Sequence, residues 1–320
     1  MKVIGRYING NYKVTIFDDG TKIRENDLDN LTPAFAENCD VCLTKKCSQN
    51  CSFCYEGCTP EGKHADIMNQ EWIHTLHPYT ELAINGNDMD HPQLIEFLET
   101  LREQKVIANI TVNQNQFMAN KTFLHALVNA GLIHGVGVSL NVPTLEFIKA
   151  VGEFPTAVVH TIAGILTEAD IKALSNYNLK VLILGYKNLG RGVTYKQSFP
   201  GIIKTNMEWL KNNLKDYIGN FNVVSFDNLA IEQLDVRSMV DEDKWDEFFM
   251  GDDGGYTFYL DCVNETFSKN SVAPENERYY LMSNVDDMFQ FIRNNGIRNT
   301  EREPLTDEEV KDIFEENFTV

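Results

Sequence analysis

Hydrophobic and polar residues alternate over the first part of the chain, residues 3–25. The alternation is interrupted at Asn9-Gly10 and again at Asp19-Gly20. Both dipeptides favour the positive φ angles of tight hairpin turns. The pattern therefore predicts a three-stranded β-meander, which we assign to an N-terminal domain of residues 1–35.

From about residue 36 the pattern changes to short apolar runs separated by longer segments with helical periodicity. This order is typical of βαβ units, in which parallel strands alternate with helices. In the segment 92–103, for example, Leu94, Leu98 and Leu101 form one apolar stripe. The strands expected from the apolar runs are 40–44, 82–85, 107–112, 135–140, 157–161 and 180–184.

Right-handed crossovers between such units coil parallel strands into a barrel, whose functional loops gather at the C-terminal ends of the strands. The predicted fold class is therefore α/β, with a partial (β/α)6 TIM-like barrel over residues 36–190. Beyond residue 190 the regularity fades. We expect residues 191–320 to form an α+β C-terminal extension that covers the barrel mouth, with a helix at 205–218, strands at 223–226 and 256–261, and two closing helices over 284–320.

Composition and charge narrow the class of protein. The chain of 320 residues contains no tract of about 18 apolar residues, so no membrane span and no membrane partner are expected. Arg6, Asn9 and Lys13 interrupt the apolar residues at the N-terminus, which argues against a signal peptide and favours a cytoplasmic location. The formal net charge of −19 disfavours nucleic acid as a partner, because it would repel a phosphate backbone.

The first candidate chemistry lies in the cysteines, six of which fall between Cys39 and Cys58. Cytosolic thiols stay reduced, so crowded cysteines are better explained as ligands than as disulfides. Cys47, Cys51 and Cys54 are close enough in sequence for one loop to wrap three corners of an iron-sulfur cubane, leaving one iron open to a further ligand. A closed zinc site, the alternative, needs a fourth ligand.

This C-x3-C-x2-C spacing, with Phe53 before the last cysteine, directly follows the first predicted barrel strand. It resembles the signature of the radical S-adenosylmethionine (radical SAM) superfamily, without indicating a subfamily. The resemblance implies that Cys47, Cys51 and Cys54 hold a 4Fe-4S cluster whose open iron binds S-adenosylmethionine. Reductive cleavage of that cofactor gives a 5'-deoxyadenosyl radical, and the electron is expected from a partner such as flavodoxin or ferredoxin.

Other positions match the superfamily in part. Where the superfamily has Gly-Gly-Glu after the second strand, this chain has Asn85-Gly86-Asn87-Asp88, and only the central glycine is kept. The segment from His160 to Gly164 resembles the adenine motif G-x-I-x-G, with histidine in place of the first glycine. The resemblance marks as cofactor-binding residues Phe53, Asn85, Gly86, Asn87, Ser139, Ile162, Gly164 and Tyr186. Apart from Phe53, the alternative is that they are ordinary turn or strand-end residues.

Several further residues have competing explanations. A second cluster or a zinc ion on the remaining thiols is disfavoured, because residues three apart on a strand point to opposite faces. Buried free cysteines, which behave as small hydrophobes, are the preferred explanation. Lys187 and Arg191 are interpreted as solvated loop charges, with contact to an anionic group as the alternative. The remaining cysteines are Cys39, Cys42, Cys58 and Cys262.

The sequence thus predicts an enzyme that uses a cofactor-derived radical to modify an unknown substrate, perhaps a peptide, a protein or a small metabolite. No catalytic side chain is assigned, because the cofactor abstracts the hydrogen. The alternative is a non-catalytic iron-sulfur or zinc-binding scaffold. Acidic residues of the extension are candidates for binding a cationic peptide or amine, namely Asp227, Glu232, Asp252, Asp253 and Asp261.

Overall fold

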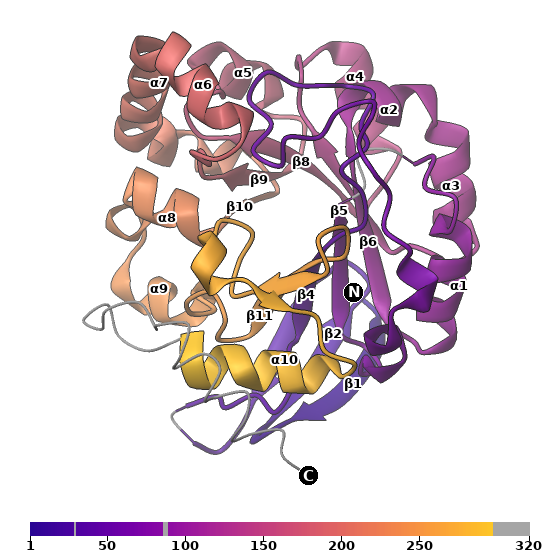
Figure 1. Cartoon of the computed structure of the whole chain (residues 1–320). Coiled ribbons are helices and arrows are strands. Elements are labelled where there is room, and N and C mark those ends of the chain that lie inside the picture. The colour runs from indigo at the N-terminus through magenta and orange to yellow at the C-terminus, as the bar shows by residue number, and fades with distance from the viewer. Residues whose placement is uncertain (29, 86–88, 297–320) are drawn as a thin grey trace.

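The computed structural model describes residues 1–28, 30–85 and 89–296 (Figure 1). Its largest element is a ten-stranded sheet with the order β10-β9-β8-β7-β6-β5-β4-β11-β12-β13. All pairings from β10 to β11 are parallel, and β12 and β13 join antiparallel. The strands are β4 (Asn38–Cys42), β5 (Glu81–Asn85), β6 (Ile107–Asn113), β7 (Gly135–Ser139), β8 (Ala157–Ile162), β9 (Lys180–Leu184), β10 (Val223–Phe226), β11 (Thr257–Asp261), β12 (Thr266–Ser268) and β13 (Tyr279–Tyr280).

The expected mixed α/β fold with a large parallel sheet is confirmed, and all six expected strands form, from β4 to β9. The number of parallel strands was predicted too low, however. The segments 223–226 and 256–261 were expected to be strands of a separate extension, whereas β10 pairs with β9 and β11 pairs with β4. The sheet therefore continues across the proposed boundary at residue 190, which itself stays a prediction.

Ten α-helices are described, and Figure 1 shows α1 to α7 packed around the outside of the curved sheet. They are α1 (Leu94–Glu103), α2 (Gln114–Ala119), α3 (Lys121–Asn129), α4 (Leu145–Gly152), α5 (Glu168–Leu174), α6 (Arg191–Ser198), α7 (Pro200–Asn213), α8 (Asn228–Leu234), α9 (Glu242–Phe248) and α10 (Val285–Phe291). The closing helices expected over 284–320 are represented by α10, and residues 297–320 lie outside the described part. No described helix is long and apolar enough to cross a membrane.

The hydrophobic core lies between the helices and the outer face of the sheet. The apolar stripe predicted for α1 is buried there, against residues such as Leu82 and Ile84 of β5. Successive strand residues point to opposite faces, so Glu81, Ala83 and Asn85 point to the inner face. The core therefore uses one face of the parallel strands and leaves the other available for a site.

The predicted meander is confirmed as an antiparallel sheet of β1 (Val3–Asn9), β2 (Tyr12–Phe17) and β3 (Lys22–Glu25). A buried ion pair joins it to the main sheet. Arg24 donates hydrogen bonds to both carboxylate oxygens of Glu37, at 2.6 Å for the shortest, and the Tyr12 hydroxyl donates to Glu37 at 2.6 Å. Because Glu37 immediately precedes β4, this contact sets where the meander meets the first strand of the parallel sheet.

Replacing Arg24 with alanine should lower the free energy of unfolding by about 3–5 kcal/mol, measured by urea denaturation at neutral pH. The physical reason is that Glu37 is only 1% exposed and would lose its bidentate partner, keeping only the Tyr12 hydroxyl and Lys22, whose Nζ lies 3.7 Å away. Arg6→Ala, at an exposed position of β1, is the control and should stay within about 0.5 kcal/mol of the wild type. Equal losses in the two variants would contradict the assigned role of the ion pair.

Burial by itself would raise the pKa of Glu37, but the hydrogen bonds and charge of Arg24 lower it overall. A carboxyl group with a lowered pKa contributes stability above its unfolded-state pKa, and that contribution is lost as the pH falls through the folded-state pKa. The wild type should therefore lose stability on acidification more steeply than Arg24→Ala.

Candidate functional site

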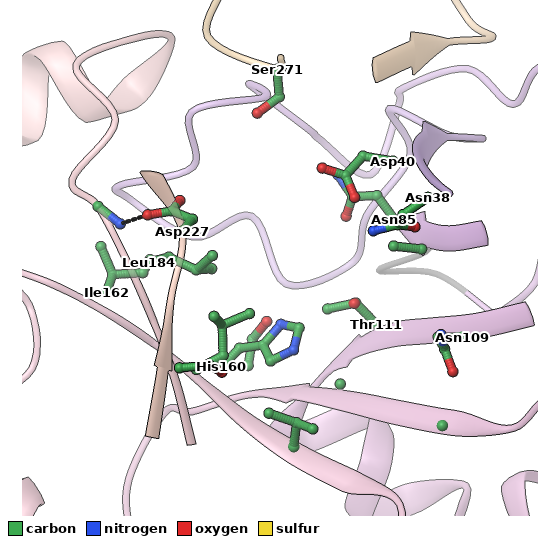
Figure 2. A pocket seen from close by; sticks show the side chains of 18 of the residues that line it. Asn38, Asp40, Asn85, Asn109, Thr111, His160, Ile162, Leu184, Asp227 and Ser271 are labelled. Atoms are coloured by element: carbon green, nitrogen blue, oxygen red, sulfur yellow. Dashed lines mark hydrogen bonds between the residues drawn. The ribbon is translucent and has the colours of Figure 1, made fainter. Parts of the chain in front are cut away.

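The inner face of the parallel sheet encloses a cavity of about 780 Å³ (Figure 2). A cavity of this volume is typical of small-molecule sites. Its walls come from every strand between β4 and β10, and loops at the C-terminal ends of the strands border it. Its polar strand residues include Asn38, Asp40, Asn85, Asn109, Thr111, Ser139, His160 and Ser225.

Two glycines of β7 leave room for the polar residues beside them. A Cβ atom at Gly137 would lie 2.5 Å from Cε1 of His160, and one at Gly135 would lie 2.7 Å from Oδ1 of Asn109. His160 is the residue that stands where the resembling adenine motif has glycine, and the missing side chain at Gly137 accommodates it. Burial lowers the pKa of His160 to about 4, so its imidazole is neutral at physiological pH.

The three cysteines of the motif lie on the loop after β4. The arms of this loop are joined by hydrogen bonds from Cys47 N to Thr59 O at 2.8 Å and from Thr59 N to Lys45 O at 3.1 Å. Cys47 is buried, whereas Cys51 and Cys54 are half-buried, and Cys54 lines the cavity.

The chemistry of this donor set fits an iron-sulfur cluster. A hydrogen bond from the Cys58 thiol lowers the pKa of Cys54 to about 6, despite burial, and the charge of Arg191 acts in the same direction. Cys54 is therefore favoured as a thiolate, the form that binds iron. Of the three motif cysteines, Cys54 is the one that lines the cavity.

The loop is held from the other side by residues at the start of α6. The Arg191 side chain donates to Cys51 O at 2.8 Å and to Cys58 O at 2.7 Å, and its backbone N–H donates to Cys54 O at 3.1 Å. Gly190, with φ of +51°, allows this approach, because a Cβ there would lie 2.3 Å from Tyr55 O. The interpretation of Arg191 as a solvated charge was therefore wrong.

Lys187 is not a solvated charge either. Its ammonium donates to Ser271 Oγ at 2.8 Å and lies 4.0 Å from the centroid of the Tyr55 ring. It lines the cavity between the cysteine loop and the C-terminal part of the chain.

The structure brings most of the described cofactor-binding candidates to this one cavity. Phe53, Asn85, Ser139, Ile162 and Tyr186 all line it, together with the ligand candidate Cys54. Gly86 and Asn87 lie outside the described residues. Their roles, and those of the residues named here, stay predictions.

Gly164 has a local structural reason to be glycine. Its φ is +84°, and a Cβ atom would lie 2.9 Å from Cγ2 of Ile203 on α7. The close packing of α7 against the turn after β8 thus accounts for this glycine without a ligand.

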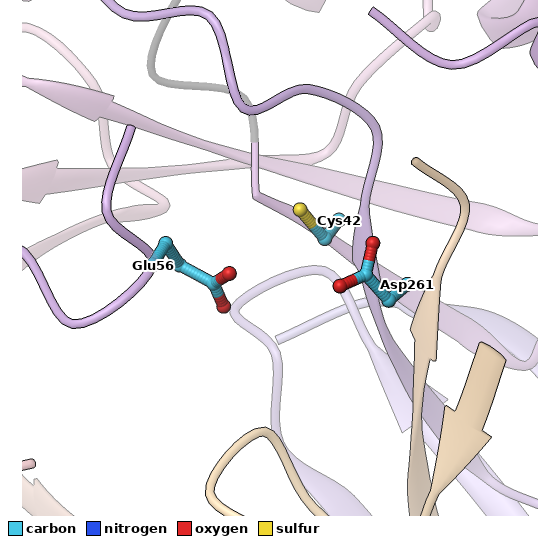
Figure 3. Close-up of side chains that lie close together, drawn as sticks. All are labelled: Cys42, Glu56 and Asp261. Atoms are coloured by element: carbon cyan, nitrogen blue, oxygen red, sulfur yellow. The ribbon is translucent and has the colours of Figure 1, made fainter. Parts of the chain in front are cut away.

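The cysteines outside the motif occupy different surroundings. Cys39 packs in the core between sheet and helices, as the strand periodicity predicts, and Cys42 points the other way. The Cys42 sulfur and one carboxylate oxygen each of Glu56 and Asp261 lie within 4.8 Å of one another (Figure 3). Cys58 instead makes a hydrogen bond with Cys54.

A lysine occupies the place that a metal ion would need in this group. Lys45 forms an ion pair with Glu56 and another with Asp261, at 3.1 Å, and the Tyr259 hydroxyl donates to Glu56 at 3.0 Å. Burial raises the pKa of Cys42 to about 12, so it remains a thiol. The group is an ion-pair network, which sequence reasoning missed because its members are far apart in the chain.

Of the acidic candidates, Asp227 and Asp253 line the cavity. Both have hydrogen-bonding partners in the protein. Asp227 caps α8 by accepting from Ala230 N at 2.8 Å, and Asp253 accepts from the side chains of Asn228 and Asn270. Glu232 and Asp252 are not among the lining residues, and Asp261 belongs to the Lys45 network.

The fold and site define an α/β protein with a cavity of mixed polar and apolar lining inside a parallel sheet, next to a loop that carries three cysteines. No model of a known protein family matches the sequence, and no characterised protein matches it. Among solved structures, that of Streptococcus suis SuiB bound to S-adenosylmethionine has a TM-score of 0.57 at 14% identity, over 84% of this chain and 69% of that one. At this identity the likeness shows a common fold.

Replacing Gly190 with alanine should destabilise the protein by about 1–3 kcal/mol, because this backbone conformation is strained for other residues. It should also reduce the iron bound after anaerobic reconstitution, because the new Cβ would push on the cysteine loop. Gly201→Ala, on α7, is the matched control, since a Cβ there has no atom within 4 Å. Urea denaturation and iron analysis measure the two effects. Normal iron content in Gly190→Ala would show that this contact does not shape the loop.

Proposed function

We propose that the protein is a radical SAM enzyme that reductively cleaves S-adenosylmethionine and modifies a substrate held inside the sheet. The observation that carries the proposal is that Cys54 and Phe53, from the cysteine motif, border the same cavity as the residues matched after the second, fourth, fifth and sixth strands. Segments far apart in the sequence thus line one cavity, as the resemblance leads us to expect. The fold shared with a structure that holds S-adenosylmethionine also supports it.

Cys47, Cys51 and Cys54 would hold the 4Fe-4S cluster, which when bound supplies an electron to the sulfonium of S-adenosylmethionine and so generates a 5'-deoxyadenosyl radical. The protein around it orients the ligands. Arg191 fixes the carbonyls of the loop, and its charge favours thiolate at Cys54. A one-electron reductant such as flavodoxin or ferredoxin is the partner that this chemistry requires.

Tyr186 contributes to cofactor binding through its ring. Its hydroxyl donates to Gly192 O at 2.7 Å. Its backbone N–H and C=O are both engaged by the side chain of Gln233, at 2.7 and 3.0 Å. The polar groups of Tyr186 therefore have partners, and the small part of its ring that lines the cavity is what could contact the cofactor.

The chain beyond residue 190 covers the substrate. Asp227, Asp253, Asn270 and Ser271 line the cavity opposite the strands. Excluding water protects a radical from side reactions, so we assign this part of the chain to the role of a lid. In this view the sheet forms a partial barrel, with the radical generated at its rim.

The second candidate is a non-catalytic scaffold, which the departure from Gly-Gly-Glu at residues 85–88 favours. The two candidates differ in what the reconstituted protein does. An enzyme should hold about four irons on three cysteines and change its cluster spectrum when S-adenosylmethionine is added. Zinc in the site, with a spectrum unaffected by S-adenosylmethionine, would identify the scaffold.

Alanine replacement of Cys47, Cys51 or Cys54 should reduce bound iron and abolish formation of 5'-deoxyadenosine under reducing conditions, because the cluster would lose one of three protein ligands. Cys262→Ala is the control, since Cys262 is buried next to β11 and apart from the motif. Iron analysis and chromatography of the products give the readouts. The proposal fails if the three motif variants cleave S-adenosylmethionine as the wild type does.

A further inference from the structure

Asp40 differs from the other carboxylates that line the cavity. It lies on the inner face of β4 and points into the cavity (Figure 2). Among the described residues it accepts no hydrogen bond and forms no ion pair, whereas Glu81 pairs with Lys22 at 3.4 Å and Glu56 pairs with Lys45. The charge of Asp40 is therefore not neutralised within the described protein.

The surroundings of Asp40 make an isolated charge unfavourable. Burial raises its pKa to about 6, and although Lys187 opposes the rise, Asp253 and Asp227 add to it. The charge of Lys187 is shared between Asp40 and Asp227, and its ammonium donates to Ser271. This end of the cavity thus has more negative than positive charge, and a cation entering it would be attracted.

A second acceptor without a donor lies on the same strand. Oδ1 of Asn38 is buried and has no hydrogen-bonding partner. Asn38 and Asp40 are two residues apart, so both side chains are on the inner face of β4, whereas Cys39 between them packs in the outer core. The Asn38 oxygen is closed off inside the protein, whereas the Asp40 carboxylate is exposed within the cavity, so Asp40 is the acceptor of this pair that a ligand donating N–H groups can reach.

We propose that Asp40 pairs with a cationic nitrogen of the substrate, an ammonium or guanidinium group, and determines specificity for it. Calling the bound cation a substrate rests on the proposed function, whereas the binding of a cation by Asp40 depends only on the cavity. An anionic substrate is disfavoured because the two described lysines that line the cavity already have partners: Lys187 donates to Ser271 and lies over the Tyr55 ring, and Lys180 donates to Asp19 O.

The experiment compares cations with neutral molecules of the same shape. Cluster-loaded protein with S-adenosylmethionine is titrated anaerobically by calorimetry with Nα-acetyl-lysinamide and Nα-acetyl-argininamide. Nα-acetyl-norleucinamide and Nα-acetyl-citrullinamide, whose α-amines are also blocked, are their neutral counterparts. The wild type should bind at least one cation about tenfold more tightly than its counterpart, as expected for a charge-assisted hydrogen bond in a cavity. The two pairs distinguish an ammonium site from a guanidinium site.

Variants assign the preference to Asp40. Asp40→Asn and Asp40→Ser should lose it without a loss of thermal stability, since the side chain has no partner to lose and its charge is unfavourable in the folded protein, and Asp40→Glu should keep part of it. Asp19→Asn is the control, because Asp19 also lines the cavity but lies on the meander hairpin, where its carboxylate accepts from Thr21 N. No cation preference in the wild type, or a preference that survives in both neutral variants, would overturn the proposal.

The same proteins separate this inference from the proposed function. If the enzyme assignment is right, Asp40→Asn should still form 5'-deoxyadenosine in the absence of substrate at the wild-type rate, because Asp40 is not among the residues assigned to the cofactor. Wild-type protein that prefers cations but does not cleave S-adenosylmethionine would refute the enzyme and leave the cation site standing. Cleavage of S-adenosylmethionine without any cation preference would support the enzyme and refute the cation site.

Discussion

The two faces of the parallel strands have opposite chemistry, and the rest of the structure depends on that division. Parallel strands are usually apolar on both faces, since helices normally cover them. Here only the outer face packs against helices, through residues such as Val41, Leu82 and Ile110. The inner face carries amides, hydroxyls and carboxylates, which would be too costly to bury against one another without ligands or water. A cavity is the consequence of this arrangement.

The cysteine loop can sit at the rim of that cavity because segments distant in the chain support it. Arg191 and Gly190, at the start of α6, reach the carbonyls of Cys51, Cys54 and Cys58. Three hydrogen bonds from one arginine residue to carbonyls along the loop add to the loop's own backbone hydrogen bonds and restrict it further. A ligand set whose geometry must suit a cluster benefits from such restriction, because preorganised ligands lose less freedom on binding.

The C-terminal part of the chain is structurally inseparable from the strands that precede it. β11 pairs with β4, so Asp261 at its end reaches Lys45 in the cysteine loop, and Ser271 reaches Lys187. These contacts place polar groups of the C-terminal part against the same cavity as the residues matched to the cofactor. Substrate recognition and cofactor binding are therefore expected to share walls, with Asp40 on the strand between them.

The sequence by itself determined the meander, the six strands from β4 to β9, the apolar stripe of α1 and the opposite orientation of Cys39 and Cys42. Each of these follows from local periodicity or turn chemistry, which a single segment displays. It also indicated a family resemblance through Cys47, Cys51 and Cys54, because close spacing on one loop is itself a local property.

Only the tertiary structure decided which segments become neighbours. β10 and β11 extend the sheet, Lys45 lies within a group that resembles a metal site, and Arg191 binds the cysteine loop. Each of these contacts pairs residues that are far apart in the chain. Periodicity specifies which face of a strand is apolar but carries no information on which strand or loop it meets. For the same reason Asp40 appeared in the sequence as an ordinary strand residue, and only the enclosing walls reveal it as a carboxylate without a partner in the described protein.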